Sequence, residues 1–143
     1  MRTSILLAVF CFAAVAAPVP KESKRGDTFE GTWQFVSAQQ YNNPLFTDDK
    51  RHDFIDADGY VRKSIEGPAL PENTAVEFRY LIDSKNNTVD LEFAGTGILL
   101  GIYKLHGESL EVCYNPKGGA RPTKIEQGPD VFLYTFKRVA PRK

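Results

Sequence analysis

The sequence predicts an all-β protein built as a single antiparallel up-and-down barrel of about eight strands. Apolar and polar residues alternate over short stretches, so the hydropathy period is two, the period of a half-buried strand. Turn-forming residues separate these stretches, and no run of about ten residues carries a helical stripe. Each predicted strand has one apolar and one polar face, which favours a closed barrel over a sandwich. The length of 143 residues fits one domain.

The chain begins with a predicted export signal, residues 1–16. Residues 5–17 are almost wholly apolar, a run of about 13 residues where a membrane-spanning helix needs roughly 20. Ala14 and Ala16 belong to an A-x-A cleavage site, so we expect the mature chain to begin at Ala17. These features predict a secreted protein, or one of the periplasm or cell envelope, without membrane insertion after cleavage. A lipoprotein signal and a retained anchor are the alternatives.

A leader, the barrel domain and a short tail follow the signal. Residues 17–28 are polar and rich in proline, which is typical of a flexible leader. The barrel is predicted over residues 29–139, and residues 140–143 form the C-terminal tail. Cleavage would remove Cys11 and leave Cys113 as the one cysteine, without an internal disulfide. We expect Cys113 to be a small buried thiol on the outward face of its strand.

The predicted strands follow one another from the first apolar alternation to the last. The first opens at residues 31–33, and the regular alternations lie at residues 76–82, 89–93, 109–114 and 132–138. The apolar members of the regular alternations are Val76, Phe78, Tyr80, Ile82, Val89, Leu91, Phe93, Leu110, Val112, Tyr114, Phe132, Tyr134 and Phe136. These side chains are expected to face inward. The stretch 47–71 is rich in Asp, and its strand register is the least defined.

One Asp-rich motif resembles part of a calcium loop. Residues 53–59 place several carboxylates before Gly59, which would be the sixth position of such a loop. Phe54 and Ile65 then stand where the first and last ligands belong. The better interpretation is a hairpin turn at Asp58 and Gly59, and we predict no metal site.

Two further features contain residue types that can bind an anion or a metal ion. Residues 116–121 are rich in glycine and hold two cations, so they could present amides and charge to an anion; an exposed flexible loop is the alternative that we favour. His52 and His106 lack neighbours at metal-ligand spacing, and we expect both on the surface at strand ends.

Two motifs resemble a known family. Residues 31–33 read Gly-Thr-Trp, a G-x-W that resembles the opening strand of lipocalins and related calycin barrels. The series G-I-Y-x-L at 101–105, L-x-V-C-Y at 110–114 and R-P-T at 121–123 is similar to a family of small secreted lipocalin-like domains best known from planctomycete bacteria. The resemblance implies a lipocalin-like barrel over roughly residues 29–138. It implies no reaction, because that family offers no catalytic residues.

The charge balance and the aromatic residues guide the predicted function. The 18 basic residues match 18 acidic ones, which removes the usual basis for binding nucleic acid. Barrels of about eight strands hold one small ligand or are filled by their own side chains. We expect a barrel without catalytic residues or cofactors that binds a small apolar or amphipathic molecule. The predicted ligand-binding side chains are Trp33, Phe78, Tyr80, Tyr103, Tyr114 and Tyr134. The alternative is a cell-envelope or extracellular protein-interaction module with a self-filled barrel.

The first and last strands are predicted to close one end of the barrel. Trp33 lies early in the first strand and Arg138 late in the last, and antiparallel pairing places them side by side. Arg138 shares the inward alternation of Phe136, so its guanidinium is expected to stack on the indole. This contact would leave the opposite end as the ligand entrance. A solvated terminal charge at Arg138 is the alternative.

Overall fold

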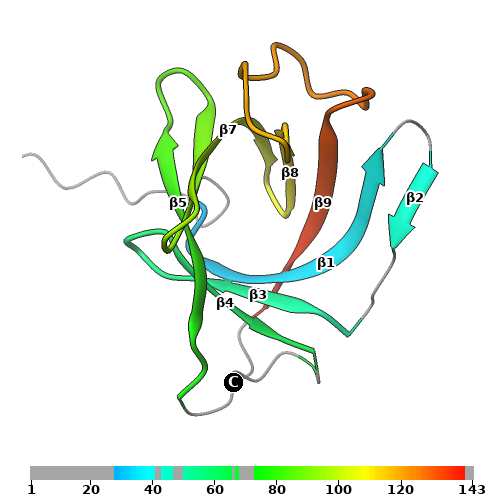
Figure 1. The fold of residues 1–143 in the computed structure, drawn as a ribbon. Helices are drawn as coiled ribbons and strands as arrows, with labels where there is room; N and C mark the ends of the chain where they lie inside the picture. The colour runs from blue at the N-terminus through cyan, green and yellow to red at the C-terminus, as the bar shows by residue number, and fades with distance from the viewer. Residues whose placement is uncertain (1–27, 41–42, 47–49, 66, 68–72, 141–143) are drawn as a thin grey trace, which may run out of the picture.

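The computed structural model describes residues 28–40, 43–46, 50–65, 67 and 73–140, which form a sheet of nine strands (Figure 1). The strands are β1 (Gly31–Gln40), β2 (Asn43–Phe46), β3 (His52–Ile55), β4 (Tyr60–Ser64), β5 (Val76–Asp83), β6 (Thr88–Phe93), β7 (Gly97–His106), β8 (Ser109–Tyr114) and β9 (Phe132–Val139). The predicted export signal and nearly all of the leader lie outside the described residues. Within those ranges, no helix has the length and hydropathy of a membrane span.

A closed antiparallel barrel is formed by eight of these strands, β1 and β3–β9. The strand β1 has three neighbours: its first half pairs with β3, its second half with β2, and its other edge with β9. The pairing of β1 with β9 closes the sheet, and Figure 1 shows β1 as a long, curved strand between the two ends of the meander. The predicted fold class is confirmed. The short β2 was not among the predicted strands.

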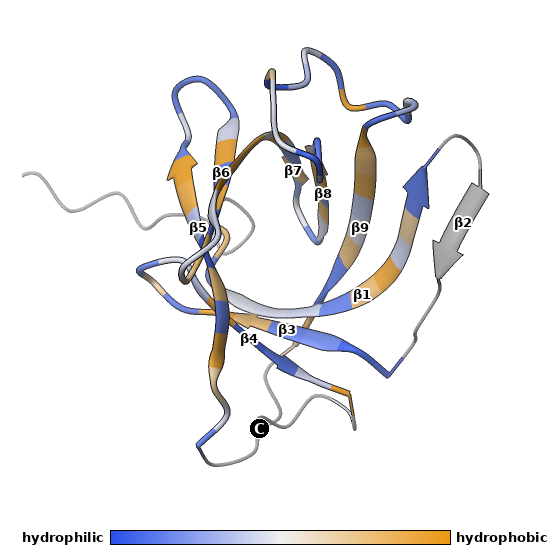
Figure 2. Cartoon of the chain, viewed as in Figure 1, coloured by the Kyte–Doolittle hydropathy of each residue, from blue (hydrophilic) through white to orange (hydrophobic). Residues whose placement is uncertain are grey.

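The barrel interior is filled from the inward side of each alternation. Figure 2 shows hydrophobic and hydrophilic residues following one another along the strands. The buried apolar side chains include Trp33, Phe35, Ile55, Val61, Phe78, Tyr80, Val89, Leu91, Tyr103, Leu110, Val112, Tyr114 and Phe136. Val76 and Ile82 share the inward alternation of β5 but lie at its two ends, where both are exposed. The burial of a side chain therefore depends both on the face of the strand and on its position along the strand.

The predicted hairpin turn joins β3 to β4. The Asp56 carboxylate accepts hydrogen bonds from the backbone N–H groups of Asp58, at 3.1 Å, and Tyr60, at 2.9 Å. Gly59 has a φ of +83°, and its carbonyl accepts a hydrogen bond from the N–H of Tyr80 at 2.8 Å. The Asp-rich motif thus organises a turn and anchors it to β5.

Substitution of Gly59 by alanine should lower the free energy of unfolding by about 2–4 kcal/mol. A Cβ atom there would lie 2.2 Å from the Tyr80 carbonyl oxygen, and the positive φ adds strain. Gly95→Ala is a matched control, because its φ is +79° but nothing lies within 4 Å of the added atom. Urea denaturation should show a loss of only about 1–2 kcal/mol for this control. Equal losses in the two variants would contradict the contact with β5.

One end of the barrel is closed by the predicted contact between the first and last strands. Trp33 and Arg138 are direct partners in the β1–β9 register, and the guanidinium carbon lies 4.2 Å from the centroid of the indole ring. Arg138 also donates hydrogen bonds to the carbonyl oxygens of Glu30, at 2.7 Å, and Thr28. The indole N–H donates to the Phe29 carbonyl at 2.7 Å. The predicted stacking is confirmed, and the alternative of a solvated charge is wrong.

The thiol of Cys113 is fully buried, as predicted. The connection between β8 and β9 covers it, because its sulfur lies 3.6 Å from the carbonyl oxygens of both Lys124 and Glu126. Burial raises the pKa of this thiol above its ordinary value. A protonated and covered thiol is a poor nucleophile, so Cys113 has a packing role.

Candidate ligand site

A cavity of about 220 Å³ lies inside the barrel, in the half away from the Trp33–Arg138 contact. It is lined by Arg51, Lys63, Phe78, Tyr80, Leu91, Phe93, Tyr114, Tyr134 and Phe136. Strand direction places it there, because β4, β6 and β8 run away from the closed end and finish near the cavity. Lys63, Phe93 and Tyr134 are partly exposed, so the cavity reaches the surface among these side chains.

Aromatic rings form two walls of the cavity. The first wall comes from β5 and β6, where Phe78 packs edge-on against Tyr80 with ring centroids 4.9 Å apart. The second wall comes from β8 and β9, where Tyr134 stacks on Tyr114 at 5.5 Å and on Phe136 at 6.3 Å. Strands β5 and β9 stand on opposite sides of the eight-stranded ring. The space between the walls therefore suits a flat, apolar group.

A buried ion pair lies beside the cavity at the start of β3. The guanidinium of Arg51 holds the Asp53 carboxylate with two hydrogen bonds of 3.0 Å, from Nε and Nη2. It also lies over the Phe35 ring, 4.6 Å from the centroid. Burial alone would lower the pKa of Arg51, but the hydrogen bonds and the charge of Asp53 outweigh it and raise that pKa. Arg51 is therefore a fixed cation in the barrel.

The second cation of the cavity is Lys63, near the end of β4. Its ammonium nitrogen lies 5.3 Å from the centroid of the Phe78 ring. Burial, and then the positive charge of Arg51, lower the pKa of Lys63 below its ordinary value. The Glu77 carboxylate, on a side chain that is 52% exposed, lies 3.8 Å from this ammonium nitrogen. This separation is longer than the roughly 2.7–3.2 Å of a good hydrogen bond, so Lys63 is only weakly neutralised.

Tyrosine hydroxyls supply the neutral polar groups of the cavity. Burial, and then the charge of Asp53, raise the pKa of Tyr80 well above its ordinary value. Burial also raises the pKa of Tyr114, which is hydrogen-bonded with Tyr134. The phenols of Tyr80 and Tyr114 therefore stay protonated at neutral pH and act as hydrogen-bonding groups, not as bases.

The structure divides the six predicted ligand-binding residues into two groups. Phe78, Tyr80, Tyr114 and Tyr134 line the cavity. Trp33 and Tyr103 do not line the cavity and pack in the closed half instead. The Phe29 ring separates Tyr103 from Tyr80, because its centroid lies 4.5 Å from that of Tyr103 and 5.7 Å from that of Tyr80. The alternation indicated the inward face of each strand correctly. It carried no information on the depth along the barrel axis.

The sequence predictions missed the three charged residues in and beside the cavity. Arg51, Asp53 and Ile55 alternate with period two, as do Val61 and Lys63. Once strand pairing shows that Ile55 and Val61 face inward, the same alternation places these charges inside the barrel. They were missed because a charged residue in a strand ordinarily faces solvent.

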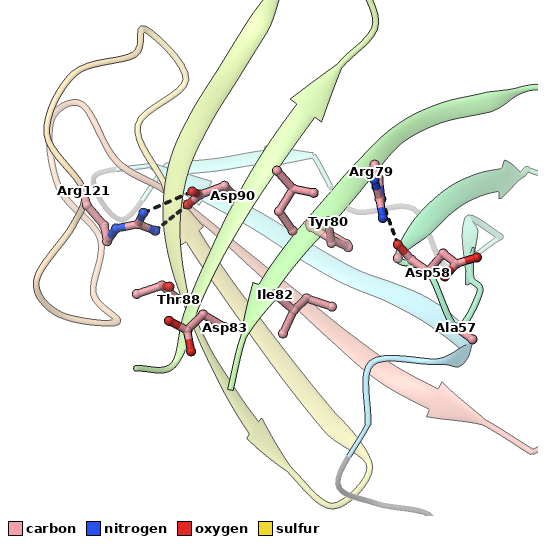
Figure 3. A pocket seen from close by; sticks show the side chains of 11 residues that line it. Ala57, Asp58, Arg79, Tyr80, Ile82, Asp83, Thr88, Asp90 and Arg121 are labelled. Atoms are coloured by element: carbon pink, nitrogen blue, oxygen red, sulfur yellow. Dashed lines mark hydrogen bonds and ion pairs between the residues drawn. The ribbon is translucent and has the colours of Figure 1, made fainter. Parts of the chain in front are cut away.

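A larger hollow of about 620 Å³ crosses the outer side of β5 and β6 (Figure 3). Arg121 reaches Asp90 there with both terminal nitrogens, at 2.5 and 3.2 Å, and Arg79 donates to the Asp58 carbonyl at 2.9 Å. Both guanidinium groups of this open surface are thus already bound by groups of the protein, Arg121 by a carboxylate and Arg79 by a backbone carbonyl. Lys117, the other cation of the predicted anion loop, pairs with Asp130 at 2.8 Å. The interior cavity is the stronger candidate site.

The described residues contain no group of three or more His, Cys, Asp or Glu side chains that could hold a metal ion. His52 is only 6% exposed, and its Nδ1 lies 2.9 Å from the Lys50 carbonyl oxygen. The expectation of a surface position is therefore wrong for His52, because the side chain is covered where β3 begins. His106 is exposed at the end of β7, as expected.

Comparison of the chain with protein-family models and with curated proteins found no match. The geometry of the barrel and of its cavity is therefore the basis for assigning a function.

Proposed function

We propose that this protein is an exported, non-catalytic binding protein that holds a small apolar or amphipathic molecule inside its barrel. The observation that carries the proposal is the interior cavity of about 220 Å³ with aromatic walls, set opposite the closed end. An engineered apolar cavity of about 150 Å³ is known to hold benzene, so this volume suits a ligand with a single ring. It is below the roughly 300–1,000 Å³ of pockets that take drug-sized molecules.

Export and family membership are parts of the same proposal. The apolar run of residues 5–17 and the A-x-A motif support removal of residues 1–16 and a place outside the cytoplasm. The G-x-W motif and the series over residues 101–123 support a place among the planctomycete-type lipocalin-like domains. An eight-stranded up-and-down barrel is compatible with that membership.

The alternative role, a protein-interaction module with a self-filled barrel, has less support. Such a module would be favoured by a contiguous apolar patch on the outer surface. Val36, Ile65 and Ile98 are exposed on separate segments of the chain. The exposed pair Tyr60 and Val76 lines a hollow of about 360 Å³ that is also bordered by four charged or cavity-lining residues, Glu77, Phe78, Arg79 and Glu92. Single exposed apolar side chains are ordinary on soluble proteins and need no partner.

Enlarging a ring at the cavity tests the proposal. Phe93→Trp adds volume to a side chain that lines the cavity, whereas Phe132→Trp makes the same change at a partly buried ring outside the lining. In a calorimetric titration, benzyl alcohol should bind the unmodified protein and the Phe132→Trp variant alike. Phe93→Trp should weaken binding by about tenfold or more, since overpacking costs about 1–3 kcal/mol. No binding to the unmodified protein, or equal weakening in both variants, would contradict the proposal.

A further inference from the structure

We propose that the ligand of this cavity is a small aromatic acid with one ring and one negative charge, its ring between the two aromatic walls and its carboxylate at Lys63 and Arg51. This inference rests on the proposed function, and it adds the chemical class of the ligand. Three properties of the cavity lead to it: its charge, the shape of its walls and its volume.

The charge of the cavity favours an anion. Two cations, Arg51 and Lys63, line it, and Asp53 is the buried carboxylate that accompanies them. Asp53 accepts two hydrogen bonds from Arg51 and also attracts Lys63 through its charge, while the exposed Glu77 carboxylate lies 3.8 Å from the Lys63 ammonium. A partly buried cation whose partner lies so far away lowers the stability of the fold, unless a bound group compensates its charge. A carboxylate is the group that compensates it most directly.

The positions of the cations fix the orientation of the ligand. Arg51 directly precedes β3 and Lys63 lies on the neighbouring strand β4, where its register partner is Asp53 of β3. The aromatic walls on β5 and β9 flank this charged side of the ring of strands. A planar acid can therefore place its ring against Phe78 or Tyr134 while its carboxylate meets the cations.

The volume and the net charge define the class further. About 220 Å³ accommodates a substituted benzene and not a long-chain lipid. Arg51, Lys63 and the buried Asp53 sum to one positive charge, which matches a carboxylate; Glu77 is half-exposed and lies outside the cavity lining. A phosphate monoester carries about −1.5 to −2 at neutral pH and would leave a buried negative charge without compensation.

Benzoate and benzamide distinguish this inference from the proposed function. The two molecules have nearly the same shape, but only benzoate is charged. In calorimetric titrations of the full chain at pH 7, benzoate should bind at least about tenfold more tightly than benzamide, the smallest effect typical of a hydrogen bond between charged groups. Equal affinities would overturn the inference and leave the proposed function intact. Binding of neither compound, together with no binding of benzyl alcohol, would overturn both.

Replacement of Lys63 by methionine tests whether the charge of Lys63 causes the preference for benzoate over benzamide. Lys63→Met should abolish the preference for benzoate, so the affinity for benzoate should fall at least about tenfold further than the affinity for benzamide. Lys104→Met, which neutralises an exposed lysine on β7, should retain the full preference. The melting temperature of the Lys63→Met variant should equal or exceed that of the unmodified protein, because a poorly compensated cation is removed from the barrel. A folded Lys63→Met variant that still prefers benzoate, or that loses both ligands equally, would overturn the inference.

Discussion

Replacing Asp53 with alanine should lower the free energy of unfolding by about 3–5 kcal/mol, because it leaves a buried charge without its partner. Asp53 is only 1% exposed and accepts both hydrogen bonds from Arg51. Without the carboxylate, Arg51 and Lys63 would face each other inside the barrel with no buried anion between them. Urea denaturation followed by circular dichroism measures the loss.

Two further variants separate this effect from a simple loss of packing. The double variant Arg51→Met with Asp53→Ala removes the charge together with its partner, so it should recover at least half of the lost stability. Asp130→Ala breaks the exposed pair with Lys117 and should cost less than about 1 kcal/mol. A single variant at Asp53 that is as stable as the unmodified protein would contradict a charged, tightly paired Arg51. A double variant no more stable than the single one would do the same.

Replacing Trp33 with alanine should lower the free energy of unfolding by about 3–5 kcal/mol, as for other large truncations in a core. Trp33 is fully buried, its N–H is bonded to the Phe29 carbonyl, and its ring carries the guanidinium of Arg138. The closed end therefore loses a filling side chain, a hydrogen bond and a stacking surface at once. Thermal and urea denaturation should both report the loss.

A double-mutant cycle isolates the contact that closes the barrel. Trp33→Phe and Arg138→Ala, singly and together, should show a coupling of about 0.5–2 kcal/mol, the range of a cation over an aromatic ring. Additive effects would contradict a stabilising contact between the two side chains. Because Trp33 does not line the cavity, Trp33→Phe should leave the affinity for benzyl alcohol unchanged.

The sequence predicted the barrel and its closure well because both depend on the period of the strands and on chain order. Trp33 and Arg138 could be paired before the structure was known, since a closed meander brings its first and last strands together. The depth of a side chain along the barrel has no such signature. Trp33 and Tyr103 were therefore predicted to contact the ligand together with Tyr80, although they lie in the closed half.

The charged side of the cavity was beyond what the alternation predicts on its own. Arg51 and Lys63 lie in the stretch 47–71, where short strands and acidic residues obscure the hydropathy pattern. Their inward positions follow from pairing with neighbouring strands, because Asp53 and Lys63 face each other in the β3–β4 register. Strand pairing is a property of the whole sheet, and a single strand of four or five residues does not reveal it.

Native mass spectrometry of the protein purified from its own host tests most directly whether the barrel holds a small molecule. The account predicts a complex heavier than the polypeptide under native conditions, and release of a single-ring compound when the protein is denatured. The unmodified chain should also gain the mass of benzoate when it is incubated with that acid. The bare polypeptide mass in every one of these spectra, with no added benzoate or benzyl alcohol retained, would contradict a ligand-binding barrel.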